Sequence, residues 1–204
     1  MKILFLDTSS FFVSIAIAED NNILYKYNGI IKDDMSSRIM PLIREGFNSV
    51  NFDIKDIDKI MVVNGPGSFT GIRIGVTVAK IIAWSLKKDI ITISSLEYLA
   101  TTNCSTKYII PMIDARRGFV YSGVYDSELN VIEKDCYTAI DTFDEYLSLG
   151  TIVSNDDISE SIKPNYDIIK IINKHINDIP ENPHSVKPEY LKLTEAEEKL
   201  KKND

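Results

Sequence analysis

A glycine-rich stretch at Asn64–Gly75 has the clearest capacity for chemistry in this sequence; it reads Asn-Gly-Pro-Gly-Ser-Phe-Thr-Gly-Ile-Arg-Ile-Gly. It lies between an apolar run at 59–63 and a long apolar segment, so a strand–loop–helix unit is predicted. Backbone N–H groups at the start of a helix can bind an anion. No Lys-Ser/Thr pair follows the last glycine, unlike a Walker loop. The spacing of Gly65, Gly67 and Gly71 is about one residue longer than the dinucleotide fingerprint. Anion binding is therefore one interpretation of this loop.

Small residues recur every four positions along the helix that is predicted after the loop: Gly67, Gly71, Gly75, Ala79 and Ala83. Positions four apart share one helix face. Each glycine inside a helix costs about 0.5–1 kcal/mol relative to alanine, so a close contact must offset that cost. Two interpretations remain open: the face packs inside its own domain, or it meets a helix of another chain.

Two polar turns end apolar runs in the two halves of the chain. Asp7-Thr8-Ser9 ends the first run, and Asp114-Ala115-Arg116-Arg117 ends a run 107 residues later (114 − 7). The repeated order of elements indicates a duplicated α/β unit. The first turn is either closed by an Asx hydrogen bond or part of a weak nucleotide site. The arginines of the second turn grip a phosphate or a carboxylate, or form a salt bridge within the turn.

Hydrophobic spacing and turn residues place the remaining elements. The first half is predicted to contain strands at 2–6, 11–18 and 23–28, a helix at Asp34–Asn48 with Asp33 and Asp34 as caps, a strand at 59–63, a helix at Phe69–Leu86, a strand at 90–93 and a helix from 94. The second half is predicted to contain strands at 107–113, 119–125 and 131–137, a helix at 141–149, and strands at 151–154 and 167–172, with 179–188 irregular and Lys199, Lys201 and Lys202 in a solvated helix end. Two lobes follow, residues 1–102 and 103–204.

Composition restricts the function classes. The chain has 204 residues, of which 44% are hydrophobic and 26% charged, and its net charge is −7. A negative chain does not attract nucleic acid by itself, so a partner is expected to supply the basic surface if RNA is involved. Cys104 and Cys136 are predicted to be free thiols. The N-terminus does not have the form of a signal peptide. The longest apolar helix contains Arg73 and Lys80, so no membrane span is predicted, and a cytoplasmic location is expected.

Histidines and tyrosines add no catalytic set. His175 and His184 are nine residues apart near prolines, so they do not form a helical ligand pair and are predicted to be solvated surface residues. Tyr121, Tyr125 and Tyr137 are predicted to lie on strand surfaces. No metal site is expected.

The glycine stretch resembles the signature of the TsaB (YeaZ) family. Further matches occur in order along nearly the whole chain: Leu6–Ser9, Arg38–Ile43, Ile113–Arg117 with Val120-Tyr121, and Pro188–Lys192. The resemblance implies an α/β, duplicated actin-like ATPase (ASKHA) fold of two β-β-β-α-β-α lobes, the second reduced. It also implies a non-catalytic scaffold subunit. Such a subunit binds a TsaD-type paralogue, which transfers threonylcarbamoyl to adenosine in tRNA, and a TsaE-type ATPase joins them.

The same resemblance separates this chain from the catalytic paralogues. TsaD-like proteins carry a His-x-x-x-His metal motif where this chain has Ser95 and Leu99. The chain is therefore expected to require no cofactor, with weak ATP or ADP binding as an option. It departs from the TsaB pattern at Met35, where many members have histidine. It also departs in residues 173–187, which replace an expected helix.

These arguments lead to two predicted sites. A partner interface is predicted at Met35, Ile39, Ile43, Gly71, Ile72, Gly75, Val76, Ala79 and Ala83. A nucleotide or anion site is predicted at Asp7, Thr8, Ser9, Gly65, Gly67, Ser68, Asp114 and Arg116. The chain alone is expected to form a homodimer, to meet tRNA only through the complex, and to contact no membrane. A Gly75→Leu change is expected to block association and leave the monomer folded. The alternative function is an ATP-dependent small-molecule kinase of the same superfold.

Overall fold

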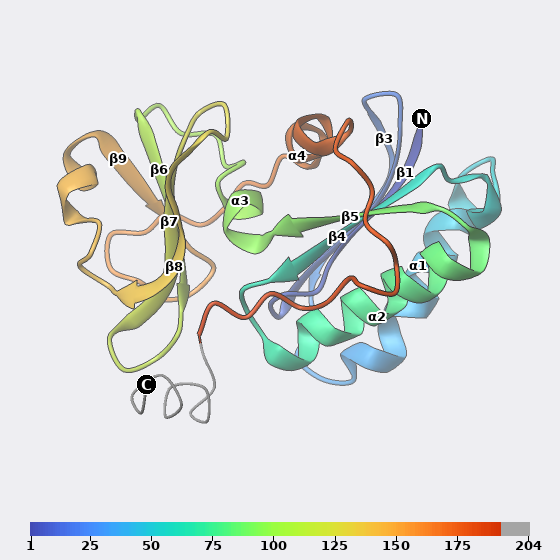
Figure 1. The fold of residues 1–204 in the computed structure, drawn as a ribbon, viewed down its shortest axis with the longest axis horizontal. Coiled ribbons are helices and arrows are strands. Elements are labelled where there is room, and N and C mark those ends of the chain that lie inside the picture. The colour runs from blue at the N-terminus through green and yellow to red at the C-terminus, as the bar shows by residue number, and fades with distance from the viewer. Residues whose placement is uncertain (193–204) are drawn as a thin grey trace.

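Two lobes, each built on its own sheet, lie side by side in the computed structural model, which describes residues 1–192 (Figure 1). The predicted helix end with Lys199, Lys201 and Lys202 lies outside the described residues. The boundary between the sheets falls after Ser94 and before Tyr108, close to the predicted boundary at 102.

The first lobe has a five-stranded sheet in the order β3-β2-β1-β4-β5. Its strands are β1 (Lys2–Asp7), β2 (Phe12–Glu19), β3 (Asn22–Ile30), β4 (Lys59–Gly65) and β5 (Asp89–Ser94), and its helices are α1 (Met35–Ser49), the 3₁₀ helix η1 (Ile54–Asp56), α2 (Phe69–Leu86) and α3 (Ser95–Leu99). The first three strands form the predicted antiparallel meander. β4 runs parallel to both β1 and β5. The bounds of α2 agree with the prediction.

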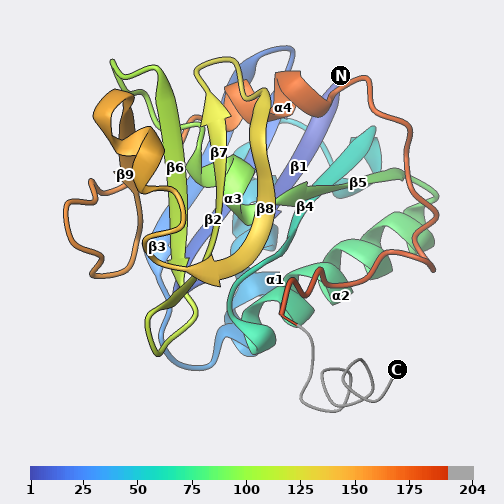
Figure 2. The ribbon, with the colours of Figure 1, turned by 60° about the vertical axis from the view of Figure 1, so that its left-hand side comes forward.

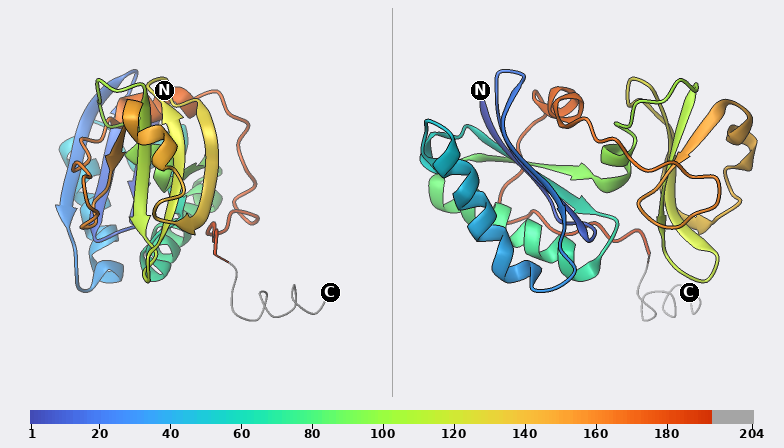
Figure 3. Two further views of the ribbon diagram at one scale, coloured as in Figure 1. Left: turned by 90° about the vertical axis from the view of Figure 1, so that its left-hand side faces the viewer. Right: turned by 180° about the vertical axis from the view of Figure 1, so that it is seen from behind.

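Strands β1, β2 and β4 are buried on both faces, whereas the edge strand β3 is exposed at alternate residues. Successive residues of a strand point to opposite sides of the sheet. Ile3 and Phe5 belong to a core shared with α3, α4 and the second lobe. Leu4 and Leu6 belong to a core beneath α1 and α2. The near-continuous apolar strands are therefore explained by a sheet covered on both sides, as Figure 3 shows from two directions.

The second lobe repeats the strand order in reduced form. Its sheet has the order β8-β7-β6-β9, which matches β3-β2-β1-β4 of the first lobe. The elements are β6 (Tyr108–Asp114), β7 (Phe119–Asp126), β8 (Val131–Ala139), the 3₁₀ helix η2 (Asp144–Leu149), β9 (Gly150–Val153) and α4 (Ile168–His175). A 3₁₀ helix thus stands where the first lobe has α1. The predicted duplicated architecture with a smaller second lobe is confirmed.

Three local predictions were wrong. The segment predicted as a strand at 167–172 is the helix α4, which buries Ile168, Ile171 and Ile172 at helical spacing. Asp167 caps it by accepting a hydrogen bond from the Lys170 N–H at 2.9 Å. β-branched residues favour strands, but burial of one helix face against two lobes outweighs that preference. Asp34 precedes α1 in a left-handed conformation without a side-chain cap. The helix predicted at 141–149 is the shorter η2.

The chain after α4 returns to the first lobe. Residues 179–190, here called the strap, run along β5 and α2 (Figure 2). Glu181 pairs with Ile90, Val186 is 1% exposed in the core beneath α2, and the Glu189 N–H donates to the Asn64 carbonyl at 2.8 Å. The predicted lobe 103–204 is therefore not one unit, because its last part packs on the first lobe.

Candidate functional site

A cleft of about 550 Å³ lies where the two lobes face each other. Most of its lining comes from the ends of β1, β4, β6 and β9 and from α3, and the rest from the start of α2, from β7 and from the segment before α4. The lining residues are Asp7, Ser9, Ser10, Phe11, Gly67, Ser68, Phe69, Ser95, Leu99, Ile113, Asp114, Ala115, Arg116, Tyr121, Asn155, Asp156 and Tyr166. Ligands of α/β sheets bind at the carboxyl ends of strands. The cleft is therefore the natural place for a ligand in this fold.

Six of the eight residues predicted for a nucleotide or anion site line this cleft: Asp7, Ser9, Gly67, Ser68, Asp114 and Arg116. The other two do not. Thr8 faces α2, where its hydroxyl donates to the Gly71 carbonyl at 2.7 Å. Gly65 is covered by the backbone of Glu189 in the strap.

The two acid-ended turns have the same local structure. The Ser9 N–H donates to Asp7 Oδ1 at 2.8 Å, and the Arg116 N–H donates to Asp114 Oδ1 at 2.8 Å. The predicted Asx bond is confirmed, and its repetition supports the duplication. The two carboxyls differ in burial, since Asp7 is 3% exposed and Asp114 is exposed. Burial raises the pKa of Asp7 to about 6, and the Ser9 hydrogen bonds oppose this rise only in part.

The cleft carries more acidic than basic groups. Asp7, Asp114 and Asp156 all line it, and Asp156 accepts a hydrogen bond from the Asp114 N–H at 2.8 Å. Arg116 is exposed at the cleft, and neither Arg116 nor Arg117 forms an ion pair with a described residue. The salt bridge considered for this turn is therefore not formed within residues 1–192. A bare phosphate would meet three carboxyls and one arginine here, which is unfavourable.

The glycine loop rests on the first turn. The Ser68 N–H donates to the Ser9 carbonyl at 2.7 Å, and Ser68 Oγ caps α2 by accepting from the Gly71 N–H at 3.2 Å. A side chain at Gly67 would collide with the Ser9 backbone. Donors that an anion would need are thus used within the chain, which weakens the anion-cradle interpretation.

The small-residue stripe faces inward, and this corrects the predicted interface. Eight of the nine residues predicted to contact a partner are buried inside the chain: Ile39, Ile43, Gly71, Ile72, Gly75, Val76, Ala79 and Ala83. A Cβ at Gly71 or Gly75 would lie closer than 3.0 Å to an oxygen of Thr8. The stripe lets α2 approach the β1–β2 turn of its own sheet. Only Met35 of the predicted set keeps partial exposure.

A different apolar surface of the two helices faces outward. Ile74, Val78 and Ile81 recur on α2 beside Met35 and Leu42 of α1; these five residues are here called the outer ridge. Ile81 is 58% exposed, and the others are half-buried. In the described part of the chain α2 has the length and apolar composition that a membrane crossing needs. However, α2 packs on the first sheet, and a helix in the core of a protein can have the same length and apolar composition.

Ser95 and Leu99, which occupy the positions of the His-x-x-x-His motif, line the cleft. The Ser95 hydroxyl donates to the Pro66 carbonyl, and Leu99 is 3% exposed in the core. Among residues 1–192 no group of three or more His, Cys, Asp or Glu side chains is arranged so that it could hold a metal ion. Cys104 and Cys136 are free thiols, as predicted.

Several residues at the lobe junction were missed or misplaced. His175 was predicted to be solvated, but its side chain is 16% exposed and bonded to Glu97. Tyr125 was predicted to lie on a strand surface, but it is 2% exposed and donates to Asp135. Asn155 and Tyr166 of the cleft were not predicted. The duplication gave a signal for Asn155, because it follows β9 as the glycine loop follows β4.

Two lobes of equivalent strand order, with an acid-ended hairpin from each facing a shared cleft, define the actin-like ATPase superfold. The family model that matches residues 12–197 is described as "TsaD: tRNA N6-adenosine threonylcarbamoyltransferase". The chain belongs to this family, and within it to the TsaB (YeaZ) group.

Individual relatives agree with this placement. The TsaB protein of Bacillus subtilis is 41% identical over 135 residues, which are 66% of this chain and 59% of that protein. The TsaB protein of Escherichia coli is 30% identical over 136 residues, 65% of this chain and 58% of that protein. The matched region thus spans less than two thirds of these relatives. The solved structure of YeaZ from Pseudomonas aeruginosa has a TM-score of 0.80 at 19% identity, covering 93% of this chain and 99% of that one, which shows the shared fold.

Proposed function

We propose that this chain is a non-catalytic scaffold subunit in tRNA threonylcarbamoyladenosine biosynthesis, and that it binds a TsaD-type paralogue through the outer ridge. Two observations carry the proposal: TsaB relatives include one at 41% identity, and the outer ridge on α1 and α2 is partly exposed, with Ile81 as its most exposed residue. The relatives from Bacillus subtilis and Escherichia coli are both named tRNA threonylcarbamoyladenosine biosynthesis protein TsaB. A TsaE-type ATPase would join the complex.

Burial on association supports the ridge as the contact surface. Ile81 alone is 58% exposed, and full burial of such a side chain stabilises an interface by about 1.5–3 kcal/mol. Apolar residues in the centre of a patch are typical of protein interfaces. In the absence of the paralogue, the same ridge would pair with a second copy of the chain to form a homodimer. tRNA would bind through the partner, because this chain carries a net charge of −7.

The non-catalytic role rests on side-chain chemistry at α3. Leucine offers no ligand atom, and the Ser95 hydroxyl is already used by the Pro66 carbonyl. Thus Ser95 and Leu99 supply no pair of metal-binding groups at the positions of the paralogue's histidines. The chain would support transfer by positioning its partner.

Charge substitution on the ridge tests the proposal. Ile81→Glu should weaken binding to the TsaD-type paralogue at least tenfold in calorimetry and lower tRNA modification in the reconstituted complex. Ile140→Glu is the matched control, because Ile140 is 43% exposed on the second lobe. Equal binding by wild type and Ile81→Glu would refute the ridge assignment. Unchanged tRNA modification when the whole chain is omitted would refute the scaffold role.

The cleft favours the alternative function, an ATP-dependent small-molecule kinase, in one respect: it joins Asp7 and Asp114 of the two hairpins. Its acidic lining disfavours a bare phosphate and would accept a nucleotide only together with a divalent cation. Weak ATP or ADP binding is therefore the expected outcome. Calorimetry with magnesium and ATP separates the two functions, since the absence of tight binding eliminates the kinase and leaves the scaffold role intact.

A further inference from the structure

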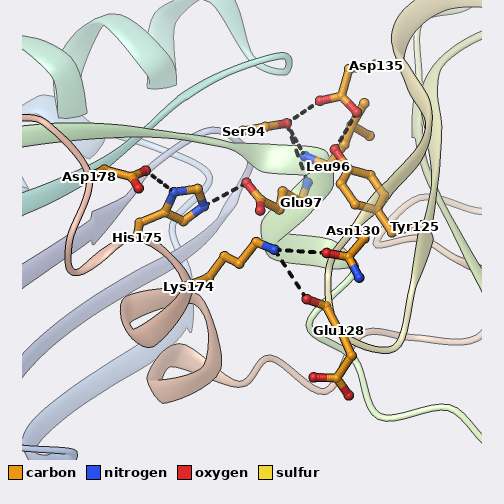
Figure 4. Close-up of polar contacts among 10 residues, drawn as sticks. All are labelled: Ser94, Leu96, Glu97, Tyr125, Glu128, Asn130, Asp135, Lys174, His175 and Asp178. Atoms are coloured by element: carbon orange, nitrogen blue, oxygen red, sulfur yellow. Dashed lines mark hydrogen bonds and ion pairs between the residues drawn. The ribbon is translucent and has the colours of Figure 1, made fainter.

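A histidine held between two carboxylates lies where the two lobes meet (Figure 4). His175 Nε2 is 2.9 Å from Glu97 Oε2, and Nδ1 is 2.6 Å from Asp178 Oδ2. The side chains of His175 and Glu97 are only 16% and 12% exposed. The pair is therefore shielded from solvent, unlike an ordinary surface ion pair.

The geometry specifies the protonation state of this histidine. An ionised carboxylate only accepts hydrogen bonds, and a neutral imidazole has one N–H and one acceptor nitrogen. Two carboxylates, one at each ring nitrogen, are both satisfied only when the ring carries two protons. If one proton left, a nitrogen lone pair would face a carboxylate oxygen at hydrogen-bond distance. With both carboxyls ionised, the arrangement therefore favours the imidazolium form.

The contact between Glu97 and His175 lies between two segments that connect the lobes, so the protonation of His175 affects the lobe junction. Glu97 is on α3, through which the chain leaves the first sheet, and α3 contacts strands of both lobes. His175 ends α4, through which the chain returns from the second lobe. The contact between Glu97 and His175 thus joins the outgoing and the returning crossover between the lobes.

Two further contacts at the junction hold the same segments. The Lys174 ammonium donates to the Glu128 carbonyl at 3.5 Å and to Asn130 Oδ1 at 3.4 Å, both in the β7–β8 turn. Ser94, just before α3, donates to Asp135 of β8. Neither contact changes with the charge of His175.

We propose that doubly protonated His175 is a latch that fixes α3 against α4 at the lobe junction, and that loss of one of its protons weakens this contact, because a neutral ring donates to only one of the two carboxylates. The device is independent of the function proposed above. It lies on the side of α3 away from the residues that line the cleft, Ser95 and Leu99.

The charged groups around His175 favour its protonated form. Burial by itself would lower the pKa of His175, but the hydrogen bonds to Glu97 and Asp178 outweigh it and raise the pKa above the ordinary value of 6.5. On β4, Lys59 turns its ammonium to the Ile176 carbonyl at 2.6 Å. On β8, burial and the charge of Glu97 raise the pKa of Asp135. The groups that contact the His175 ring directly are thus the carboxyls of Glu97 and Asp178.

The direction of the pH effect follows from this raised pKa. A basic group with a raised folded-state pKa contributes stability below its unfolded value, and this contribution is lost as pH rises through the folded value. The latch is thus fully closed below about pH 6.5 and opens on the alkaline side of that value.

Ring NMR of the full chain tests the latch directly. The sequence has two histidines, and His184→Gln leaves one signal without touching the latch, because His184 is exposed on the strap. The His175 ring should titrate above 6.5 and show both N–H protons below that transition. Glu97→Gln should lower the titration midpoint, and Asp178→Asn should lower it less, because Asp178 is 51% exposed. A His175 midpoint at or below 6.5 would overturn the proposal.

Hydrogen exchange separates a latch from a merely charged histidine. After correction for intrinsic base catalysis, amides of α3 and α4 should exchange several-fold faster above the His175 transition, whereas amides of α1 should not. His175→Gln should remove this pH dependence. If Glu97→Gln does not fold, Asp178→Asn and His175→Gln still decide the question. Identical corrected exchange on both sides of the transition would show that the proton does not hold the junction.

Discussion

The hydroxyl of Thr8, in the first hairpin, donates to the carbonyl of Gly71 of α2 at 2.7 Å. This contact explains why α2 contains glycines. A side chain at Gly71 would meet the Thr8 carbonyl oxygen, and one at Gly75 would meet Thr8 Oγ1. The cost of mid-helix glycine is offset inside the chain.

Alanine at the two glycines should therefore destabilise the fold, and for different reasons. Gly75→Ala should cost about 1–3 kcal/mol through overpacking, and Gly71→Ala should cost more because it collides with backbone. Thr8→Ala removes the atom in the way of position 75, so it should rescue Gly75→Ala in a double-mutant cycle. It should not rescue Gly71→Ala. Urea denaturation measures the three single and two double variants, and equal rescue at both positions would contradict this packing. Gly75→Leu should unfold the chain, contrary to the expectation from the sequence.

Asp7→Asn should stabilise the protein at neutral pH. The amide keeps an oxygen for the Ser9 N–H and removes a buried charge, whose pKa of about 6, raised from 3.8, corresponds to a cost of about 3 kcal/mol. An acid with a raised pKa contributes most stability below its unfolded pKa and loses it as pH rises through 6. The gain should be full at pH 8 and should vanish near pH 4. Denaturation in a chelating buffer measures it, and Asp114→Asn, at the exposed equivalent turn, should show no gain.

The strap should contribute stability through one buried side chain. Val186→Ala removes methyl groups that are 1% exposed beneath α2 and should cost about 1–3 kcal/mol. Ile179→Ala, in the same segment but 91% exposed, should change the free energy of unfolding by less than about 0.5 kcal/mol. Equal costs at both positions would mean that the strap does not pack on the first lobe in solution.

Tyr125→Phe should weaken the junction between β7 and β8. The Tyr125 hydroxyl donates to Asp135 at 2.5 Å, and an apolar replacement leaves a mostly buried carboxyl with one donor fewer. A loss of about 1–3 kcal/mol is expected. Tyr137→Phe is the control, because Tyr137 is half-buried and its ring stacks on Phe119. Thermal unfolding of the two variants should separate them clearly, and matching midpoints would contradict this role.

Local patterns in the sequence were enough to predict most of the architecture. The short apolar run of β1, ended by a polar turn, and the small-residue period in α2 each predicted the correct element, because both are local properties of the sequence. The polar turns at Asp7 and Asp114 predicted the duplication, and an Asx bond was one of two interpretations of the Asp7 turn. Six residues of the cleft were also found in this way, because turns that follow equivalent strands lie at equivalent edges of the two sheets.

The direction in which a face points was decided only by the tertiary structure. The small stripe through Gly75 required a close contact, but periodicity alone does not distinguish the chain's own Thr8 from a partner's helix. The same holds for α4, whose isoleucines form a helix because two lobes bury one side of it. His175 is shielded from solvent and hydrogen-bonded at both ring nitrogens, and one of its partners, Glu97, is 78 positions away in the sequence. Contacts of such sequence separation depend on how the lobes close on each other, which no local pattern records.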